Sequence, residues 1–388
     1  MVFDFMLAMA LVFIGILAGM LSALLGLHPN TLASITSQTG VDNPILFILP
    51  MLVASSFFAL IPAIFFSIPD ATIVSVLPGK KMFLEGKGKE ALATCAYAMF
   101  FGIIASIALF PLAQPIVSIA YTAVRPYLLY VLAAAAIAMV AGERSMRKRF
   151  AAMFLFFAAG LLGTFAFSLG LPDPLFSVFT GFFALPALLF SSDAGVLQKE
   201  EGTKFPFSFS YWKECASGTG FAFISTLLPG ISTPAQMATF AGMLLPFASD
   251  ERKYLAFISS LNGSQIIFSL ASLLVIGKAR MGVYAQFSDF FTSQDVLGYL
   301  LLLVVSALLA FLAMLLVMKN IDISKFRLTK EMRYAIAAYL VAMSFLLNGI
   351  FGIIIMAAAL LLGFLAAKEG LRKHLMGAII LPTFAYLW

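Results

Sequence analysis

Apolar runs of about twenty residues recur along the whole chain, and an α-helix needs a run of that length to cross a bilayer. Of the 388 residues, 62% are hydrophobic and only 11% are charged, whereas an ordinary soluble domain has roughly 25% charged residues. Because backbone groups in lipid must be paired within the chain, such runs form helices. The sequence therefore predicts an all-α, polytopic membrane protein, and the recurring apolar runs leave no room for a separate soluble domain.

Basic residues gather between the apolar runs and predict which side of the membrane each loop faces. The 24 Lys and Arg exceed the 18 Asp and Glu and give a net charge of +6. Loops rich in Lys and Arg stay in the cytoplasm, so topology explains this charge without nucleic acid as a partner. We expect a multi-pass protein of the cell (plasma) membrane with its N-terminus outside. The first run, 5–25, has no basic residue before it and is predicted to be a retained helix.

Ten crossings are predicted from the apolar runs and the loops between them. They cover residues 44–66, 91–113, 117–140, 150–170, 174–192, 254–276, 297–318, 334–347, 349–367 and 375–388. Two segments remain, 5–42 and 214–248, and both are too long for one crossing and are interrupted by Gly, Pro and small polar residues. Each is predicted to be a helical hairpin that enters the membrane and returns, or two short crossings. In both cases the chain ends on the side where it began.

The two hairpins divide the chain into halves with the same plan. Residues 1–195 hold the hairpin at 5–42 and five crossings, and residues 205–388 hold the hairpin at 214–248 and five crossings. One half begins outside and the other inside. The halves are therefore predicted to be inverted-topology repeats, which are characteristic of many secondary transporters and raise the expectation of alternating access.

Matching polar motifs interrupt the two hairpins. The two motifs are LLGLHPNTLAS at 24–34 and LLPGISTPAQMA at 227–238. In each of them apolar residues and a glycine precede a proline. Proline suits the first position of a helix, and Thr233 before Pro234 with Gln236 after it forms a capping-box pattern. His28 precedes Pro29 in the same way. Both motifs are predicted to be helix starts within the membrane.

Two helix starts near the middle of the membrane would form an anion site without buried charges, because each carries free N–H groups and about half a positive charge. A carboxylate or a phosphate is the expected ligand, and ordinary helix kinks are the alternative interpretation. The candidate substrate-binding residues are Gly26, His28, Pro29, Asn30, Thr31, Gly230, Ser232, Thr233, Pro234 and Gln236.

A second polar group lies in the helix that follows each hairpin. It comprises Ser55 and Ser56 in the first half and Asn262, Ser264 and Gln265 in the second. These side chains could complete the cavity or bind Na⁺, or they could pack one helix on another. No cofactor is expected, and the coupling ion is either Na⁺ or H⁺. A pKa near 6.5 would let His28 couple protons, although a neutral helix cap is the simpler role.

Three stretches of the sequence resemble the TctA family, the large membrane subunit of tripartite tricarboxylate transporters. They are GMLSALLGLHPNTLASI at 19–35, IPDATIVSVLPGKKMFLEGKGKEALATCAYAMFFG at 68–102, and FISTLLPGISTPAQMATFAG at 223–242. The resemblance implies a secondary transporter of organic anions with an elevator-like motion, and it implies that the hairpin tips, 26–31 and 229–234, bind the substrate. A periplasmic binding protein and a small membrane subunit are implied as partners, and whether this chain needs them is left open, as is a homodimer.

The function predicted here is secondary active transport of a small di- or tricarboxylate, coupled to Na⁺ or H⁺. A translocase of a lipid-linked phosphate is the alternative, because polar hairpin tips would suit a phosphate head group equally. An enzyme is not expected, since the sequence has no H-E-x-x-H motif and no pair of carboxylates within the predicted crossings. A scaffold would not need two polar helix breaks in the bilayer.

Overall fold

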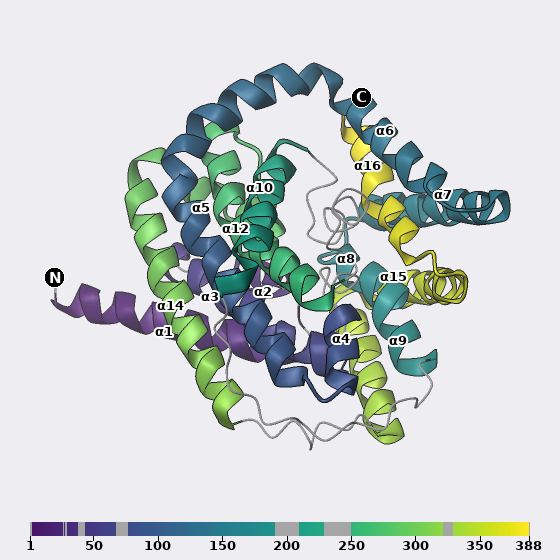
Figure 1. Ribbon diagram of the computed structural model, residues 1–388, viewed down its shortest axis with the longest axis horizontal. Helices are drawn as coiled ribbons and strands as arrows, with labels where there is room; N and C mark the ends of the chain where they lie inside the picture. The colour runs from purple at the N-terminus through teal and green to yellow at the C-terminus, as the bar shows by residue number, and fades with distance from the viewer. Residues whose placement is uncertain are drawn as a thin grey trace.

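The computed structural model describes residues 2–25, 27, 29–37, 43–66, 77–190, 209–228, 250–320 and 329–387. Every regular element in these ranges is a helix, which confirms the predicted all-α fold (Figure 1). The α-helices are α1 (Val2–Leu24), α2 (Pro29–Ser37), α3 (Ile45–Phe58), α4 (Leu77–Leu84), α5 (Gly88–Val124), α6 (Leu128–Ala141), α7 (Met146–Ser168), α8 (Pro174–Phe179), α9 (Leu185–Phe190), α10 (Trp212–Leu227), α12 (Glu251–Ile276), α13 (Gly282–Gln286), α14 (Val296–Asn320), α15 (Lys330–Glu369) and α16 (Gly377–Leu387).

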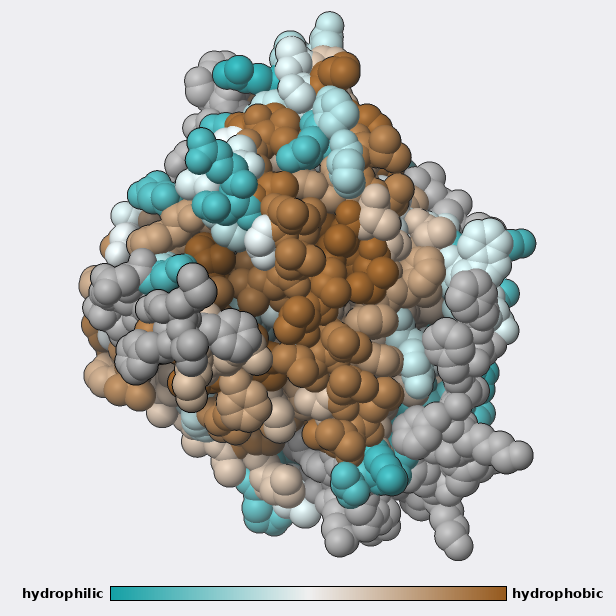
Figure 2. All heavy atoms as spheres, turned by 90° about the vertical axis from the view of Figure 1, so that its left-hand side faces the viewer, coloured by the Kyte–Doolittle hydropathy of each residue, from teal (hydrophilic) through white to brown (hydrophobic). Residues whose placement is uncertain are grey.

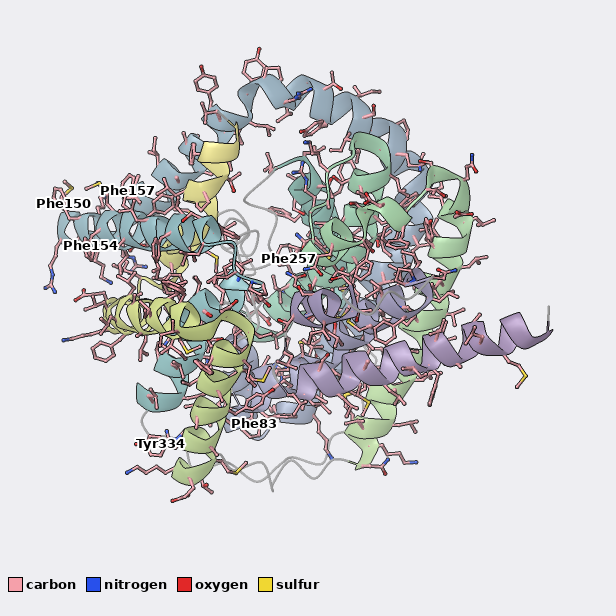
Figure 3. All side chains as sticks on the ribbon, turned by 180° about the vertical axis from the view of Figure 1, so that it is seen from behind. Phe83, Phe150, Phe154, Phe157, Phe257 and Tyr334 are labelled. Carbon is pink, nitrogen blue, oxygen red and sulfur yellow. The ribbon has the colours of Figure 1, made fainter. Side chains whose placement is uncertain are left out.

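Seven helical stretches among the described residues are long and apolar enough to cross a membrane. Two of them, Gly88–Ala141 and Lys330–Glu369, are 54 and 40 residues long and exceed the roughly 20 residues of one crossing. A broad hydrophobic face covers the side where α14 and α5 lie (Figure 2). On α7, Phe150, Phe154 and Phe157 point outward along one stripe (Figure 3) and are each more than half exposed. These surfaces suit contact with lipid.

Two predicted helix boundaries had different outcomes. The break between 113 and 117 is wrong, because α5 continues through Pro111 and Pro115 to Val124. Proline removes one backbone bond but does not end a helix whose neighbours pair the freed groups. The break near 348 is confirmed: Gly349 has φ +61° and ψ −153° in the middle of α15 and divides it into two helices.

The last predicted crossing is also shorter than expected. Residues 375–388 were predicted to cross the membrane, but the helix there, α16, has eleven residues, and a short 3-10 turn, η10 (Arg372–Met376), precedes it. The predicted crossing at 174–192 consists of α8, the π-helical turn η4 (Thr180–Ala184) and α9. The described apolar part of this crossing, Pro174–Leu189, is shorter than the seven helical stretches that are long enough to cross a membrane.

The first arm of each hairpin runs parallel to the helix that follows the hairpin. In α1, Gly15 lies against the carbonyl of Phe47 and Gly19 against that of Met51, so both chains advance in the same direction. In α10, Gly218 lies against the carbonyl of Phe257 in α12, and further along both helices Ser225 contacts Gln265, so these two helices also run in the same direction. A side chain at these glycines would overlap the opposing backbone. The chain must therefore turn back between the two parallel helices, as a hairpin requires.

Glycine contacts also recur in pairs between the two halves of the chain. They join α7 to α16 and α15 to η4, and in each contact a glycine lies directly against a backbone carbonyl of the other helix. The pairs are Gly163 with Ala378, Gly363 with Phe182, Gly377 with Phe156, and Gly181 with Met356. Reciprocal contacts of this kind are expected of two related repeats, and the inverted orientation of the halves stays a prediction.

Two main hydrophobic cores hold the helices together. Residues of α1, α3, α5, α12 and α14 form one core, and residues of α6, α7, η4, α15, η10 and α16 form the other. In Figure 1 the two helix groups lie on opposite sides, and α5 arches over the top to α6. Each core contains helices from both predicted halves, so the halves are intertwined and do not fold as two separate bodies.

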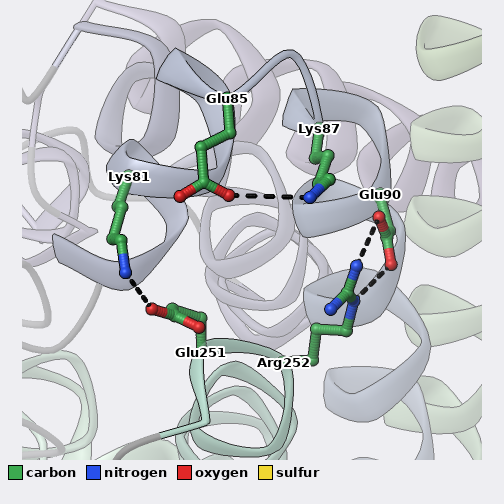
Figure 4. Close-up of polar contacts among 6 residues, drawn as sticks. All are labelled: Lys81, Glu85, Lys87, Glu90, Glu251 and Arg252. Carbon is green, nitrogen blue, oxygen red and sulfur yellow. Dashed lines mark hydrogen bonds and ion pairs between the residues drawn. The ribbon is translucent and has the colours of Figure 1, made fainter. Parts of the chain in front are cut away.

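Ion pairs tie the start of α12 to α4 and α5 (Figure 4). Lys81 lies 2.5 Å from Glu251, and Arg252 pairs with Glu90 through two bonds of 2.5 and 3.3 Å. Asp250 caps α12 by accepting the amides of residues 252 and 253. These residues belong to predicted cytoplasmic loops, where charged pairs remain accessible to water.

Candidate functional site

The first predicted helix start lies where the sequence places it. After α1 ends at Leu24, the amide of Leu27 donates to the carbonyl of Ser22 at 2.8 Å, and α2 begins at Pro29. Proline costs nothing at this position because the first N–H of a helix has no partner within it. Gly26 and His28 lie outside the described residues, so their predicted roles stay predictions.

The short helix α2 packs against the segment that follows α12. Gln286 Nε2 donates to Ser34 Oγ at 2.8 Å. Gly282 faces the side chain of Asn30 so closely that a methyl group there would lie 2.6 Å from its Nδ2 atom. Asn30, a candidate substrate-binding residue, is therefore held at the surface of α13.

Thr31, the next candidate residue, belongs to a buried polar network that no sequence motif indicates. Its hydroxyl donates to the Asp173 carboxylate, whose other oxygen caps α8 by accepting the amide of Phe176 at 3.1 Å. Thr31 is fully buried and Asp173 is 8% exposed. The network joins the first hairpin to the start of α8, across 142 residues of sequence.

Asn348, at the kink of α15, completes this network. Its side chain accepts the amide of Asp173 at 3.0 Å and donates to the carbonyl of Asp173 at 2.6 Å and to Ser177 Oγ at 2.8 Å. Ser177 also shares a hydrogen bond of 2.7 Å with Ser344. Every polar group in the network thus has a partner, as buried polar groups need. The network fixes the geometry of α2, α8 and the kink relative to one another.

The second hairpin is described only along its first arm. α10 ends at Leu227, level with the middle of α12, because Gln265 Nε2 in α12 donates to Ser225 Oγ at 3.1 Å. The predicted tip residues lie outside the described residues; they are Gly230, Ser232, Thr233, Pro234 and Gln236. Their role as the second helix start stays a prediction.

The second polar group is placed on helix surfaces that face other helices or their own backbone. Ser264 donates to the carbonyl of Gly102 at 2.9 Å, so it packs α12 against α5, and Gln265 bonds α10. Ser55 and Ser56 both donate to the carbonyl of Leu52 one turn earlier. Asn262 is half-buried on α12. These bonds correspond to the packing alternative, and the Na⁺ alternative stays a prediction.

Residues 277–286, which we call the return segment, follow α12 and join the first hairpin to the first arm of the second. The return segment turns at Gly277 and folds back along α12, so that the hydroxyl of Tyr284 donates to the carbonyl of Ile266 at 3.0 Å. Ile266 lies ten residues before the end of α12, or about 15 Å along the helix axis. On the way, Arg280 Nε donates to the carbonyl of Thr226 at the end of α10 at 2.7 Å. Residues 280–286 therefore contact both hairpins.

Sequence signals for the missed residues exist, but they are weak. Asp173-Pro174 repeats the pattern of a cap residue before a proline at a helix start, and Asn348 precedes the glycine that predicts the kink. Arg280 carries no local signal, because only the folded path of 277–286 brings it to the end of α10. Among the described residues, no group of three or more His, Cys, Asp or Glu could hold a metal ion.

Comparison with known proteins identifies the family. The model of the tripartite tricarboxylate transporter TctA family matches residues 6–377, nearly the whole chain. An uncharacterized protein of Methanocaldococcus jannaschii is 25% identical over 400 residues, a match that covers 98% of this chain and 99% of the relative. No solved structure matches the chain. The family match includes both hairpins, the return segment and the network around Asp173, and the chain therefore belongs to the tripartite tricarboxylate transporter TctA family.

Proposed function

We propose that this protein is a secondary active transporter of a small di- or tricarboxylate, which binds between the tips of the two hairpins. The observation that carries the proposal is the return segment, whose residues 280–286 contact Thr226 at the end of α10 and Asn30 at the tip of the first hairpin. Helix starts provide N–H donors and partial positive charge for a carboxylate. Membership of a tricarboxylate transporter family supports the same class of substrate.

An elevator-type mechanism is part of the proposal. The two main hydrophobic cores would let one helix group move against the other while each stays packed. A smaller cluster, which includes Ala113, Leu132 and Phe257 and packs α5 and α12 against α6, would have to repack during that motion. The network from Thr31 through Asp173 to Asn348 joins a hairpin of one core to helices of the other. Its hydrogen bonds would have to break and re-form if the two groups slide. The reciprocal glycine contacts support two related repeats. Inverted repeats would provide equivalent outward-facing and inward-facing states.

The remaining parts of the proposal concern energy and partners. Na⁺ or H⁺ is the proposed coupling ion, since a carrier that concentrates an anion needs a gradient. The family's tripartite organisation supports a small membrane subunit and a binding protein as partners, and a homodimer is a further proposed assembly. We place the protein in the plasma membrane with its N-terminus outside.

Gradient-driven uptake into proteoliposomes tests the proposed function. The purified protein would be reconstituted with an imposed Na⁺ gradient, an imposed pH gradient or neither, and uptake of radiolabelled succinate and citrate measured. We expect accumulation that depends on one of the gradients. Asn30→Ala and Thr233→Ala should each abolish uptake while the protein remains monodisperse, and Ser37→Ala, on the exposed end of α2, serves as the matched control.

Two results would contradict the proposal. Absence of uptake across a panel of mono-, di- and tricarboxylates under every gradient would exclude the substrate class. Full activity in both tip variants would show that the hairpin tips are structural. Flipping of a fluorescent polyprenyl phosphate by the same vesicles would favour the lipid-linked phosphate translocase instead.

A further inference from the structure

A cluster of basic side chains lies at the end of the molecule where α7 begins and α15 ends. Nη2 of Arg147, on α7, lies 3.2 Å from Oε1 of Glu369, on α15. Nζ of Lys373, on η10, lies 2.8 Å from Oε1 of Glu143, which precedes α7. These contacts bring the two charged segments to one place, which we call the basic corner. Its basic residues are Arg144, Arg147, Lys148, Arg149, Lys368, Arg372 and Lys373.

The basic corner carries most of the net charge of the protein. Its seven basic side chains are accompanied by two carboxylates, Glu143 and Glu369, so its net charge is +5, against +6 for the whole chain. The ion pairs in Figure 4 differ, because Lys81, Lys87 and Arg252 each have a carboxylate of their own. Positive-inside topology accounts for basic residues in cytoplasmic loops, but it does not supply their counter-charges. The basic corner therefore has an excess of positive charge for an anion to balance.

Several of these cations have no carboxylate partner within the part of the chain that the structure describes. Arg372 is half-buried on η10 and makes no ion pair there. Lys148 and Arg149 are exposed in the first turn of α7, where the positive end of the helix dipole disfavours cations. Arg147 has a partner, but its side chain is 84% exposed, and such a surface pair is weak. These side chains are free to bind an anion from outside the chain.

The exposed face of α7 indicates which kind of anion fits. From Arg147 onward, exposed apolar side chains recur every three or four residues and therefore lie on one face of the helix. Figure 3 shows the first three of them pointing outward. From residue 147 to residue 165 this stripe is about 27 Å long, close to the roughly 30 Å of the hydrocarbon core, so Arg147 lies at the level of the lipid headgroups. The apolar members of the stripe are Phe150, Phe154, Phe157, Leu161 and Phe165.

We propose that the basic corner binds the headgroup of an anionic phospholipid of the cytoplasmic leaflet, whose acyl chains lie along the apolar stripe of α7. The inference goes beyond the proposed transport function and involves no residue of the two hairpins. Basic residues directly on the cytoplasmic side of a membrane helix attract anionic lipids, and each Lys or Arg contributes about fivefold in affinity. The phosphate of the lipid would supply the counter-charge that α7, α15 and η10 lack.

Native mass spectrometry of the full chain tests this inference. The protein in a mild detergent would be mixed with phosphatidylglycerol or with phosphatidylcholine of identical acyl chains, and the retained lipid molecules would be counted. We expect the wild type to retain phosphatidylglycerol in preference to phosphatidylcholine. A triple variant with Arg147→Gln, Lys148→Gln and Arg149→Gln should bind phosphatidylglycerol about a hundredfold more weakly, since it loses three cations. The matched control also loses three exposed cations from predicted cytoplasmic segments, through Lys213→Gln, Lys319→Gln and Lys330→Gln.

The control should bind phosphatidylglycerol as the wild type does. Equal binding by the wild type and the triple variant at the basic corner would show that this corner does not hold the headgroup. An equal loss in the control would show that the lipid responds to the overall charge and not to this corner. Displacement of the lipid by inorganic phosphate would mean that the corner binds a soluble anion, and this would overturn the assignment to a lipid.

Quenching of tryptophan fluorescence tests the position of the lipid in the membrane, without the triple variant. Phe154→Trp places a reporter in the stripe of α7, in a chain that also carries Trp212→Phe and Trp388→Phe. In vesicles that contain both lipids, brominated phosphatidylglycerol should quench this reporter more strongly than brominated phosphatidylcholine. The preference should shrink as salt rises from about 0.01 M to about 1 M, because the Debye length falls from about 30 Å to about 3 Å.

The same measurement can contradict the inference in two ways. Equal quenching by the two brominated lipids would show that the stripe is in contact with lipid but selects no headgroup. Absence of quenching by either lipid would show that a protein partner, such as a second copy of this chain, covers the stripe. Both results would overturn the proposed lipid site, even if the triple variant does not insert into the membrane.

Discussion

Asp173 is the residue whose removal should most clearly disturb the contact between the first hairpin and the second helix group. Its carboxylate accepts the hydroxyl of Thr31 and the amide of Phe176, and it is 8% exposed. Asp173→Ala removes a helix N-cap, which costs about 1 kcal/mol, and a hydrogen bond to a charged group, which costs about 1.5–3 kcal/mol. The free energy of unfolding should therefore fall by about 2.5–4 kcal/mol.

Asp173→Asn distinguishes the two contributions. The amide oxygen can still cap α8, and a neutral hydrogen bond to Thr31 replaces the charged one, so the loss should be only about 1 kcal/mol. Unfolding in mixed micelles of SDS and a mild detergent would measure these differences. Asp289→Ala, at an exposed aspartate, is the control and should change the value by less than about 0.5 kcal/mol. A loss for Asp173→Ala as small as that of the control would refute the network as a stabilising element.

The remaining predictions concern packing, ion pairs and pH. Gly163→Ala and Gly363→Ala each press a methyl group on an opposing carbonyl and should lower the free energy of unfolding by about 1–3 kcal/mol. Gly298 faces open space, so Gly298→Ala should raise the free energy of unfolding. Equal melting temperatures in all three variants would argue against the close helix contacts. Glu90→Arg should lower the free energy of unfolding by about 1 kcal/mol, and adding Arg252→Glu to the same chain should restore the lost stability. A double variant as unstable as Glu90→Arg alone would mean that this ion pair contributes nothing. Burial lowers the pKa of His374 despite its bond to Glu143; burial raises the pKa of Glu143, but Lys373 and His374 lower it more. Both groups bind protons less readily in the folded state, so protonation favours the unfolded state. The melting temperature should therefore fall as the pH drops below about 6.5 and again near 4.5. If the fall below pH 6.5 persists in His374→Gln, it does not come from this histidine.

Local signals in the sequence were sufficient for the helices and for several of their ends. Pro29 begins α2 and Gly349 divides α15 because proline and glycine act within one turn of their own position. The signal failed at Pro111 and Pro115, where α5 continues. A proline shows that one backbone bond is missing, but neighbouring helices decide whether the helix ends there.

The candidate site depends on contacts that no local pattern contains. Asp173 meets Asn348 across 175 residues of sequence, and Arg280 reaches the carbonyl of Thr226 only because the chain folds back along α12. The order of the predicted crossings places Arg280 in an outside loop, and the fold brings its side chain to the end of α10. The predicted anion site relied on neutral helix starts, and the contact of Arg280 with the end of α10 could be found only in the folded structure.

Counterflow in proteoliposomes is the direct test of alternating access, because a carrier that alternates between two states exchanges substrate faster than it moves substrate in one direction. Vesicles would be loaded with millimolar unlabelled citrate or succinate, diluted into a trace of the labelled anion, and followed over time without any ion gradient. Alternating access predicts a transient overshoot of label that vanishes in Asn30→Ala. Label that only equilibrates, at the same rate in loaded and empty vesicles, would contradict alternating access by this protein.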